Sequence, residues 1–199
     1  MKKFKIRVKR IEAHQLNDRL LLINLYLTQA LTLIVGLIWI LFQGRNPLAL
    51  LAVPKELEFL YWGLGLAAAM LVVDLILSRF VSEDSMDDGG INEMLFRNRP
   101  IWHILVIAIV VSVCEELLFR GAIQHAFGPY WTSILFALIH VRYLKHWLPT
   151  GWVFLSSYGL GLVYIYTGTL WAPILCHFLI DFISGMLIRF RRKEENERT

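Results

Sequence analysis

Charged residues are scarce in this sequence, and they are missing from long stretches of it. Only 18% of its 199 residues are Asp, Glu, Lys or Arg, whereas 57% are hydrophobic. Soluble domains carry about 25% charged residues. Residues 20–42 run for 23 positions without a formal charge, and about 20 apolar residues are enough to cross a bilayer as a helix. The sequence therefore excludes an ordinary soluble domain and predicts an integral membrane protein.

The first apolar stretch is too long for a secretory signal peptide. The apolar region of such a peptide spans about 7 to 15 residues and precedes a small-residue cleavage site. Here the stretch continues into Phe42-Gln-Gly-Arg-Asn-Pro47, which lacks that pattern. We therefore interpret residues 20–42 as a retained helix.

Cysteine is also scarce. Cys114 and Cys176 both fall in apolar stretches, so the sequence does not indicate a disulfide framework of the secreted kind.

The net charge of +4 would suit nucleic acid, but the basic residues gather at the ends of apolar segments, where orientation in a membrane explains them. The expected partner is the lipid bilayer, and nucleic acid is not expected.

Apolar segments recur along the chain, and none shows the alternation of a β-strand. We predict an all-α fold, a polytopic transmembrane helix bundle in which a core of four helices carries the site. The roughly six predicted spans are residues 20–42, 60–77, 101–127, 130–147, 151–167 and 170–189. The predicted regions are a basic cytoplasmic N-terminus (1–19), two N-terminal transmembrane helices (20–77), a cytoplasmic loop (78–100), the four-helix core (101–189) and a charged cytoplasmic tail (190–199).

Basic residues are unevenly divided between the two sides of this topology. With a cytoplasmic N-terminus, 17 Lys and Arg residues fall in cytoplasmic segments, whereas only Arg45 and Lys55 fall outside. The positive-inside rule therefore places both termini in the cytoplasm. We expect the protein to reside in the plasma membrane.

Ionisable residues inside the predicted spans are functional candidates, because they are costly to insert into a bilayer. Glu116 and Arg120 lie four positions apart, so they share one helix face and can form an ion pair. Glu115 is rotated by about 100° from Glu116 and can point elsewhere. We therefore predict a supporting ion pair, Glu116 with Arg120, and one carboxylate for chemistry, Glu115.

Glu115 and His140 are predicted to lie at one depth. Glu115 precedes Gly128 by 13 residues, and His140 follows it by 12. Gly128-Pro129 is a turn signal between two antiparallel helices. At about 1.5 Å per residue, both side chains lie roughly 18 to 20 Å from that turn.

His177 and Asp181 are predicted to reach the same layer from another helix. They follow the next turn on that side, at Gly168, by 9 and 13 residues, or about 14 and 20 Å. Because they are four positions apart, both face one way. A network that only holds helices together seldom uses so many ionisable groups, so we favour a functional site.

Two chemistries suit one Glu and two His around a shared point. A carboxylate and an imidazole can deprotonate water for attack on a peptide carbonyl, and a second imidazole can stabilise the oxyanion. Glu115, His140 and His177 could instead bind a divalent metal such as zinc, whose bound water becomes the nucleophile. The residues leave both alternatives open.

Three motifs stand in order along the last helices: Glu115-Glu-Leu-Leu-Phe-Arg120, Phe136-Ala-Leu-Ile-His140 and His177-Phe-Leu-Ile-Asp181. They resemble the E-E-x-x-x-R, F-x-x-x-H and H-x-x-x-N/D motifs of the CPBP (Abi) family. That family comprises intramembrane proteases similar to the endopeptidase that trims prenylated CAAX proteins. The resemblance covers roughly residues 100–188 and leaves the first two helices unassigned.

The resemblance implies a role for each matching residue. Glu115 would activate water with His140, while His177 and Asp181 would contact the developing oxyanion. The prenyl-protease members have Asn where this chain has Asp181, and an ionised Asp cannot donate a hydrogen bond. Asp181 would therefore either be kept neutral by burial or only orient His177. The supporting residues are Glu116, Arg120 and Phe136, the last as a packing wall for His140.

Two other functions fit parts of this pattern. The same fold could serve as a non-catalytic membrane scaffold or bacteriocin-immunity protein, although every polar motif position is filled here. Buried carboxylates and histidines also relay protons in transporters, but the sequence shows neither an inverted repeat nor paired Gly- or Pro-interrupted helices. We therefore expect a (metallo)endopeptidase whose substrate is a peptide or protein, either lipidated or membrane-bound.

Overall fold

A computed structural model describes residues 18–80, 90–141 and 144–198. Every regular element in these ranges is a helix. Most of the predicted basic N-terminus lies outside the described residues, as do residues 81–89 of the predicted loop. The elements are α1 (Asp18–Phe42), α2 (Pro47–Leu50), α3 (Glu58–Phe80), α5 (Ile91–Phe96), α6 (Ile101–Glu116), the π-helix η2 (Leu117–Ile123), α7 (Gln124–Ile139), α8 (Trp147–Thr167) and α9 (Trp171–Arg198).

Helices of membrane-spanning length confirm the predicted fold class. Five helical segments in the described part of the chain are long and apolar enough to cross a bilayer. One of them, Ile101–Ile139, combines α6, η2 and α7, and it contains most of the third and fourth predicted spans. The other four are Asp18–Phe42, Glu58–Phe80, Trp147–Thr167 and Trp171–Arg191.

The long segment reverses at the predicted turn. Gly128 has φ 75° and ψ 172°, a conformation that glycine adopts without strain, and Pro129 follows it. The chain then folds back, so that the ring of Phe136 lies 4.7 Å from that of Phe119. The two predicted helices are therefore an antiparallel pair.

The fourth predicted span is shorter in the structure than residues 130–147. Helix α7 ends at Ile139, and His140 leaves it with φ −80° and ψ 53°. The polar side chains of Lys145 and His146 follow soon after, and such groups are costly in hydrocarbon. The earlier helix end places His140 at a helix terminus rather than in mid-span.

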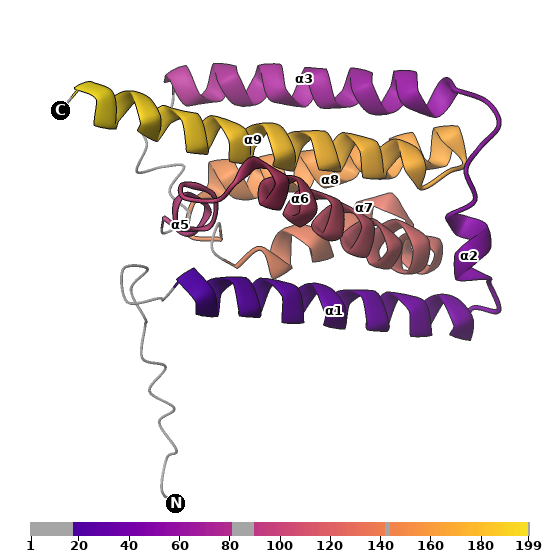
Figure 1. The fold of residues 1–199 in the computed structure, drawn as a ribbon. Coiled ribbons are helices and arrows are strands. Elements are labelled where there is room, and N and C mark those ends of the chain that lie inside the picture. Colours follow the sequence, from indigo (N-terminus) through magenta and orange to yellow (C-terminus); the bar gives the residue numbers. More distant parts are fainter. Residues whose placement is uncertain (1–17, 81–89, 142–143, 199) are drawn as a thin grey trace, which may run out of the picture.

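Helices α1 and α3 flank a core formed by α6 to α9 (Figure 1). Helix α3 packs on α9 and α8, α7 packs on α8, and α1 packs on α6 and η2. The start of α1, helix α5 and the end of α9 lie together at one end of the bundle, and α2 lies at the other (Figure 1). The predicted four-helix core is thus the centre of the molecule.

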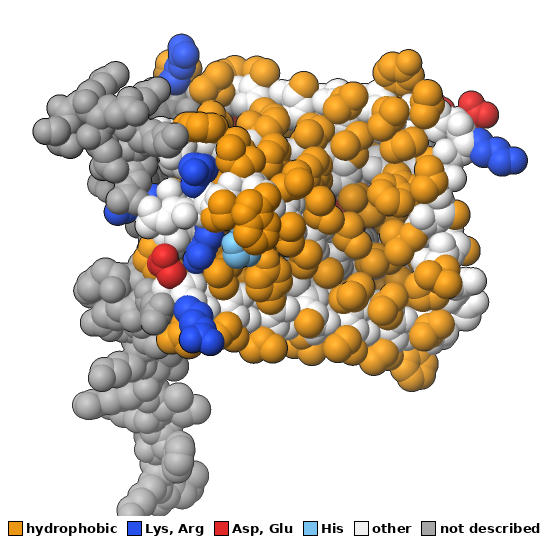
Figure 2. Space-filling view, in the orientation of Figure 1, with side chains coloured by type: hydrophobic (Ala, Val, Ile, Leu, Met, Phe, Trp, Pro, Cys, Tyr) orange, Lys and Arg blue, Asp and Glu red, His pale blue; other side chains and the backbone are white. Residues whose placement is uncertain are grey.

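The outer surface suits a lipid environment. Large apolar side chains such as Leu27, Leu31 and Leu75 are exposed along α1 and α3, and Figure 2 shows an apolar face whose Lys and Arg side chains gather mainly at the α5 end. An apolar surface of this extent is a membrane face in a folded protein. The protein is therefore an integral membrane protein, and the cytoplasmic location of the basic end stays a prediction.

Helix α1 packs unusually closely on η2. A Cβ on Gly36 would lie 3.1 Å from the Cα of Leu118, so only glycine fits without displacement. Beyond it, Gln43 Nε2 donates to the carbonyl of Ala122 at 2.9 Å, and Arg45 Nη1 donates to the carbonyl of Gly121 at 2.6 Å. A π-helix disturbs the regular backbone pairing, and these two side chains satisfy carbonyls in it.

This contact predicts that Gly36→Leu destabilises the protein. The added side chain would push α1 away from η2, and overpacking of this kind costs about 1–3 kcal/mol. Gly65→Leu on α3 is the matched control, because a Cβ there meets no atom within 4 Å. Thermal unfolding in detergent should show a lower midpoint for Gly36→Leu only; equal midpoints would contradict the close packing of α1.

Candidate active site

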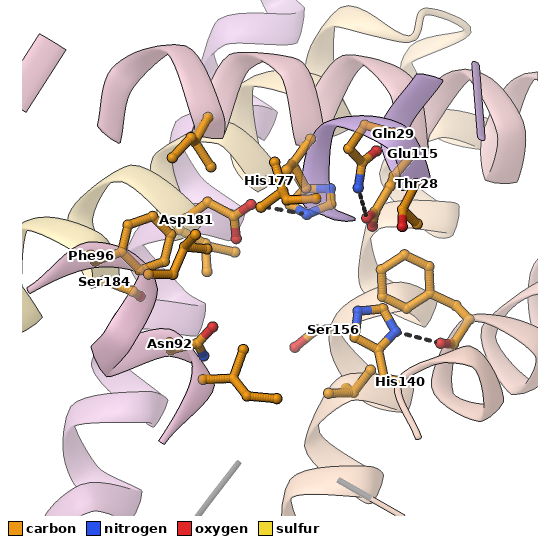
Figure 3. Close-up of a pocket in the computed structure, with 18 of the residues that line it drawn as sticks. Thr28, Gln29, Asn92, Phe96, Glu115, His140, Ser156, His177, Asp181 and Ser184 are labelled. Carbon is orange, nitrogen blue, oxygen red and sulfur yellow. Dashed lines mark hydrogen bonds and ion pairs between the residues drawn. The ribbon is translucent and has the colours of Figure 1, made fainter. Parts of the chain in front are cut away.

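The four predicted catalytic residues line one cavity of about 430 Å³ (Figure 3). Glu115 comes from α6, His140 from the end of α7, and His177 and Asp181 from α9. Residues up to 66 positions apart in sequence (181 − 115) thus meet at one place. The arrangement matches the layer that the helix spacings predict.

Glu116 and Arg120 form the predicted ion pair. Arg120 Nε lies 3.0 Å from Glu116 Oε2, and Nη1 donates to Oε1 at 3.1 Å. Both side chains are completely buried. Arg120 Nη2 also donates to the carbonyl and hydroxyl oxygens of Ser157 on α8, at 2.8 and 3.0 Å. Arg120 therefore links η2 to α8, and the motif spacing did not predict this contact with Ser157.

Glu116 also holds His177, which the sequence did not predict. The His177 Nδ1 atom lies 2.8 Å from Glu116 Oε1. Because a carboxylate paired with arginine only accepts, Nδ1 carries the proton and donates it. On the other side of the ring, Nε2 lies 3.6 Å from Asp181 Oδ2. His177 is thus set between two carboxylates, one on a neighbouring helix and one on its own.

Phe136 lies at the centre of the site residues. Its ring is 4.5 Å from the ring of His140 and 4.7 Å from that of Phe119, and Arg120 Cζ lies 5.2 Å from its centroid. An aromatic face at this distance attracts a guanidinium. The predicted packing wall for His140 is therefore present, and it also borders the buried ion pair.

The end of α7 fixes the orientation of His140. Its Nδ1 atom lies 2.6 Å from the carbonyl oxygen of Phe136, one of the last carbonyls of the helix, which lack a regular partner within it. A carbonyl only accepts, so Nδ1 carries the proton. In a neutral ring the second nitrogen, Nε2, then bears the lone pair that a general base needs.

Glu115 is held by a residue of α1. Gln29 Nε2 donates to Glu115 Oε1 at 2.9 Å, and Glu115 Oε2 has no hydrogen-bond partner among the described residues. Gln29 was not predicted from the sequence, although an amide inside an otherwise apolar span is a common sign of a helix contact in membranes. Other polar cavity residues that were not predicted are Asn24, Thr28, Asn92, Ser156 and Ser184.

The side chains do not form a ready metal site. Within the described ranges, no three His, Cys, Asp or Glu residues are placed so that they could hold one ion. The Nδ1 atoms of His140 and His177 are hydrogen-bonded to Phe136 and Glu116, an arrangement that metal-ligating histidines also use. The zinc alternative therefore stays a question for experiment, and we derive no step through a metal.

The two cysteines are not part of the cavity lining that the described residues form. Both are buried, and Cys176 packs with Ala67, Met70 and Leu160 in an apolar cluster. Their positions agree with a packing role.

A bundle of apolar helices around a cavity lined by acids and imidazoles defines an integral membrane protein with a buried polar site. The family model "Type II CAAX prenyl endopeptidase Rce1-like" matches residues 97–183, the segment that carries all three motifs. The chain belongs to this family, and the resemblance to the CAAX-type proteases is confirmed.

Two bacterial proteins are similar over most of the chain. One is "Uncharacterized protein YpbD" of Bacillus subtilis (strain 168), 35% identical over 146 residues, which cover 72% of this chain and 77% of that protein. The other is "UPF0177 protein YxdF" of Lactococcus lactis subsp. lactis (strain IL1403), 25% identical over 173 residues, which cover 82% of this chain and 94% of that protein. No solved structure gives a significant match.

Proposed function

We propose that the protein is an intramembrane endopeptidase. The observation that carries this proposal is the convergence of Glu115, His140 and His177 from three helices on one cavity inside an apolar bundle. Membership of the Rce1-like family supports a protease-like role. Burial strengthens each electrostatic interaction with the reacting groups, because water and its screening are excluded.

Water is the nucleophile in the proposed reaction. Glu115 and Nε2 of His140 both accept hydrogen bonds from this water, and one of its protons passes to this pair of bases while its oxygen attacks the carbonyl carbon of the scissile peptide bond. The same proton then passes to the leaving nitrogen as the C–N bond breaks, so the products are a carboxylic acid and an amine. Each step uses a group that lines the cavity.

His177 stabilises the charge that develops on the carbonyl oxygen. When both ring nitrogens carry protons, Nδ1–H is held by Glu116 and Nε2–H is directed at the oxyanion. In the absence of substrate, Asp181 lies on the Nε2 side and orients the ring. This role needs no hydrogen-bond donor at Asp181, which accounts for an Asp at this position.

The cavity points to a substrate that enters from the basic end of the bundle. Its wall includes Leu21 near the start of α1, Asn92 on α5 and Ile188 in the C-terminal half of α9. The start of α1, helix α5 and the end of α9 lie at one end of the bundle (Figure 1). With the proposed orientation, that end faces the cytoplasm. We infer a peptide segment of a protein that is held at the cytoplasmic face of the plasma membrane, by a lipid anchor or by its own helix.

Cleavage by the purified, reconstituted protein tests this function. The probes are internally quenched peptides with a farnesylated C-terminal CAAX sequence and the same peptides without the lipid. His140→Gln should lower kcat by about 10²- to 10⁴-fold, because the general base is lost. The matched control is His125→Gln, an exposed histidine of α7, which should cleave like the wild type.

Three outcomes would contradict the proposal or its mechanism. Cleavage of neither probe by the wild-type protein would argue against the endopeptidase, and full activity of His140→Gln would remove the proposed base. Treatment with a chelator distinguishes a mechanism in which side chains activate the water from one in which a bound metal does. Activity that is lost on treatment with a chelator and restored by zinc would favour the metal alternative.

A further inference from the structure

The first helix contributes a buried side chain to the site although it lies outside the family match at residues 97–183. Gln29 is only 6% exposed, and a buried amide is costly unless it is hydrogen-bonded. Its donor meets Glu115 Oε1. We propose that Gln29 is the positioning residue of Glu115, and that α1 is for this reason part of the catalytic unit.

The position of α1 is fixed by three small or polar residues at regular spacing. Gln29, Gly36 and Gln43 are seven residues apart, so successive members are offset by only about 20° around the helix and share one face. They contact, in the same order, Glu115, Leu118 and the carbonyl of Ala122. This stripe aligns α1 with the α6–η2 segment and sets the depth of the Gln29 amide.

Only one of the two carboxylate oxygens of Glu115 accepts a hydrogen bond from Gln29. A carboxylate only accepts, so the amide must present its N–H side to Oε1. Oε2 has no hydrogen-bond partner in the described part of the chain and is left to accept a proton from water. Without Gln29 the carboxylate could rotate, and small displacements of a catalytic group lower the rate strongly.

The inference rests on the proposed function, and it predicts a selective loss in Gln29→Met. Methionine keeps nearly the same length and volume but lacks the donor. In the farnesylated-peptide assay, kcat should fall by about 10- to 100-fold with KM little changed, as expected when an orienting partner of an active-site group is lost. The loss should appear in kcat because Gln29 acts through Glu115 and not through substrate binding.

Gln124→Met is the matched control. It removes the same kind of amide from a side chain that is also 6% exposed, but the lost hydrogen bond, 2.8 Å long, goes to the backbone carbonyl of Gly161 and lies outside the cavity. Gln124→Met should lower the thermal midpoint and leave kcat close to that of the wild type. Equal kcat values for Gln29→Met and wild type, or an equal loss in both variants, would overturn the proposal.

An exchange of the two groups tests the contact without an activity assay. Gln29→Glu places two carboxylates together and should lower the thermal midpoint, whereas Gln29→Glu combined with Glu115→Gln restores an amide–carboxylate pair and should recover it. The recovered protein should stay inactive, because the carboxylate is then on the wrong helix. A midpoint that is not recovered would overturn the contact itself; a wild type that cleaves neither probe would instead overturn the endopeptidase and the catalytic role of Gln29 with it.

Discussion

Glu115→Gln is expected to lower kcat by about 10²- to 10⁴-fold, the range that a general base contributes. Glutamine keeps the size of the side chain but cannot take a proton from water. Glu115 lies in the cavity and has one oxygen without a hydrogen-bond partner among the described residues. The change should therefore remove the proton acceptor and disturb the packing of the side chain very little. Steady-state cleavage of the farnesylated peptide, with the thermal midpoint measured in parallel, checks this result.

Glu58→Gln is the control for the loss of one negative charge. Glu58 is an exposed residue at the start of α3, where its carboxylate accepts from Trp62 Nε1 at 3.3 Å. This variant should cleave like the wild type. Full cleavage by Glu115→Gln would contradict the role of Glu115 as a base, whereas a wild type that cleaves neither probe would favour the scaffold or immunity function.

The largest effect on stability is expected at the buried ion pair. Arg120→Met leaves Glu116 charged and uncompensated by its partner, and breaking a buried pair in this way costs about 3–5 kcal/mol. It also removes two hydrogen bonds to Ser157. Glu116→Leu with Arg120→Met removes both charges and should recover part of the stability, but not the activity, because His177 loses its Nδ1 partner.

An exposed pair provides a matched control for burial. Glu93 on α5 and Arg97, which directly follows α5, have the same spacing of four residues and the same 3.0 Å contact as Glu116 and Arg120, but the side chains of Arg97 and Glu93 are 42% and 60% exposed. Arg97→Met should therefore cost only about 0.2–1 kcal/mol. Similar losses of unfolding free energy at both pairs, measured by denaturant titration in detergent, would contradict a buried structural role for Arg120.

The helical membrane fold could be predicted largely from the long stretches that contain no charged residue. Long apolar stretches can satisfy their backbone in a membrane only as helices or closed barrels, and the stretches here lack strand alternation. The antiparallel turn at Gly128 and the pairing of Glu116 with Arg120 also follow from local rules: a turn signal, and a spacing of four on a helix. These features depend on residues that are close in sequence.

Contacts between helices could not be predicted in the same way. The bond from His177 to Glu116 joins residues 61 positions apart, and that from Gln29 to Glu115 joins residues 86 apart. Each depends on how far one helix slides along or rotates against another, which the spacing within a single helix does not set. The regular stripe at Gln29, Gly36 and Gln43 was the available signal, but its partner became visible only in the packed bundle.

The π-helix is a further feature that local spacing did not reveal. It starts at Leu117, directly after the two glutamates, and contains Arg120. Its hydrogen bonds span one residue more than those of an α-helix, which changes the direction of the side chains that follow, and π-helical turns often occur at functional sites. Its carbonyls at Gly121 and Ala122 are satisfied by Arg45 and Gln43, so the distortion is supported from α1.

Mass spectrometry of the products formed in ¹⁸O-enriched water tests the central claim most directly. The reconstituted wild-type protein should cut the membrane-anchored peptide at one bond and place one ¹⁸O atom in the new carboxyl group, and Glu115→Gln should yield no such product on the same time scale. No cleavage by the wild type, or the same labelled product from Glu115→Gln at an undiminished rate, would contradict hydrolysis by water that Glu115 activates.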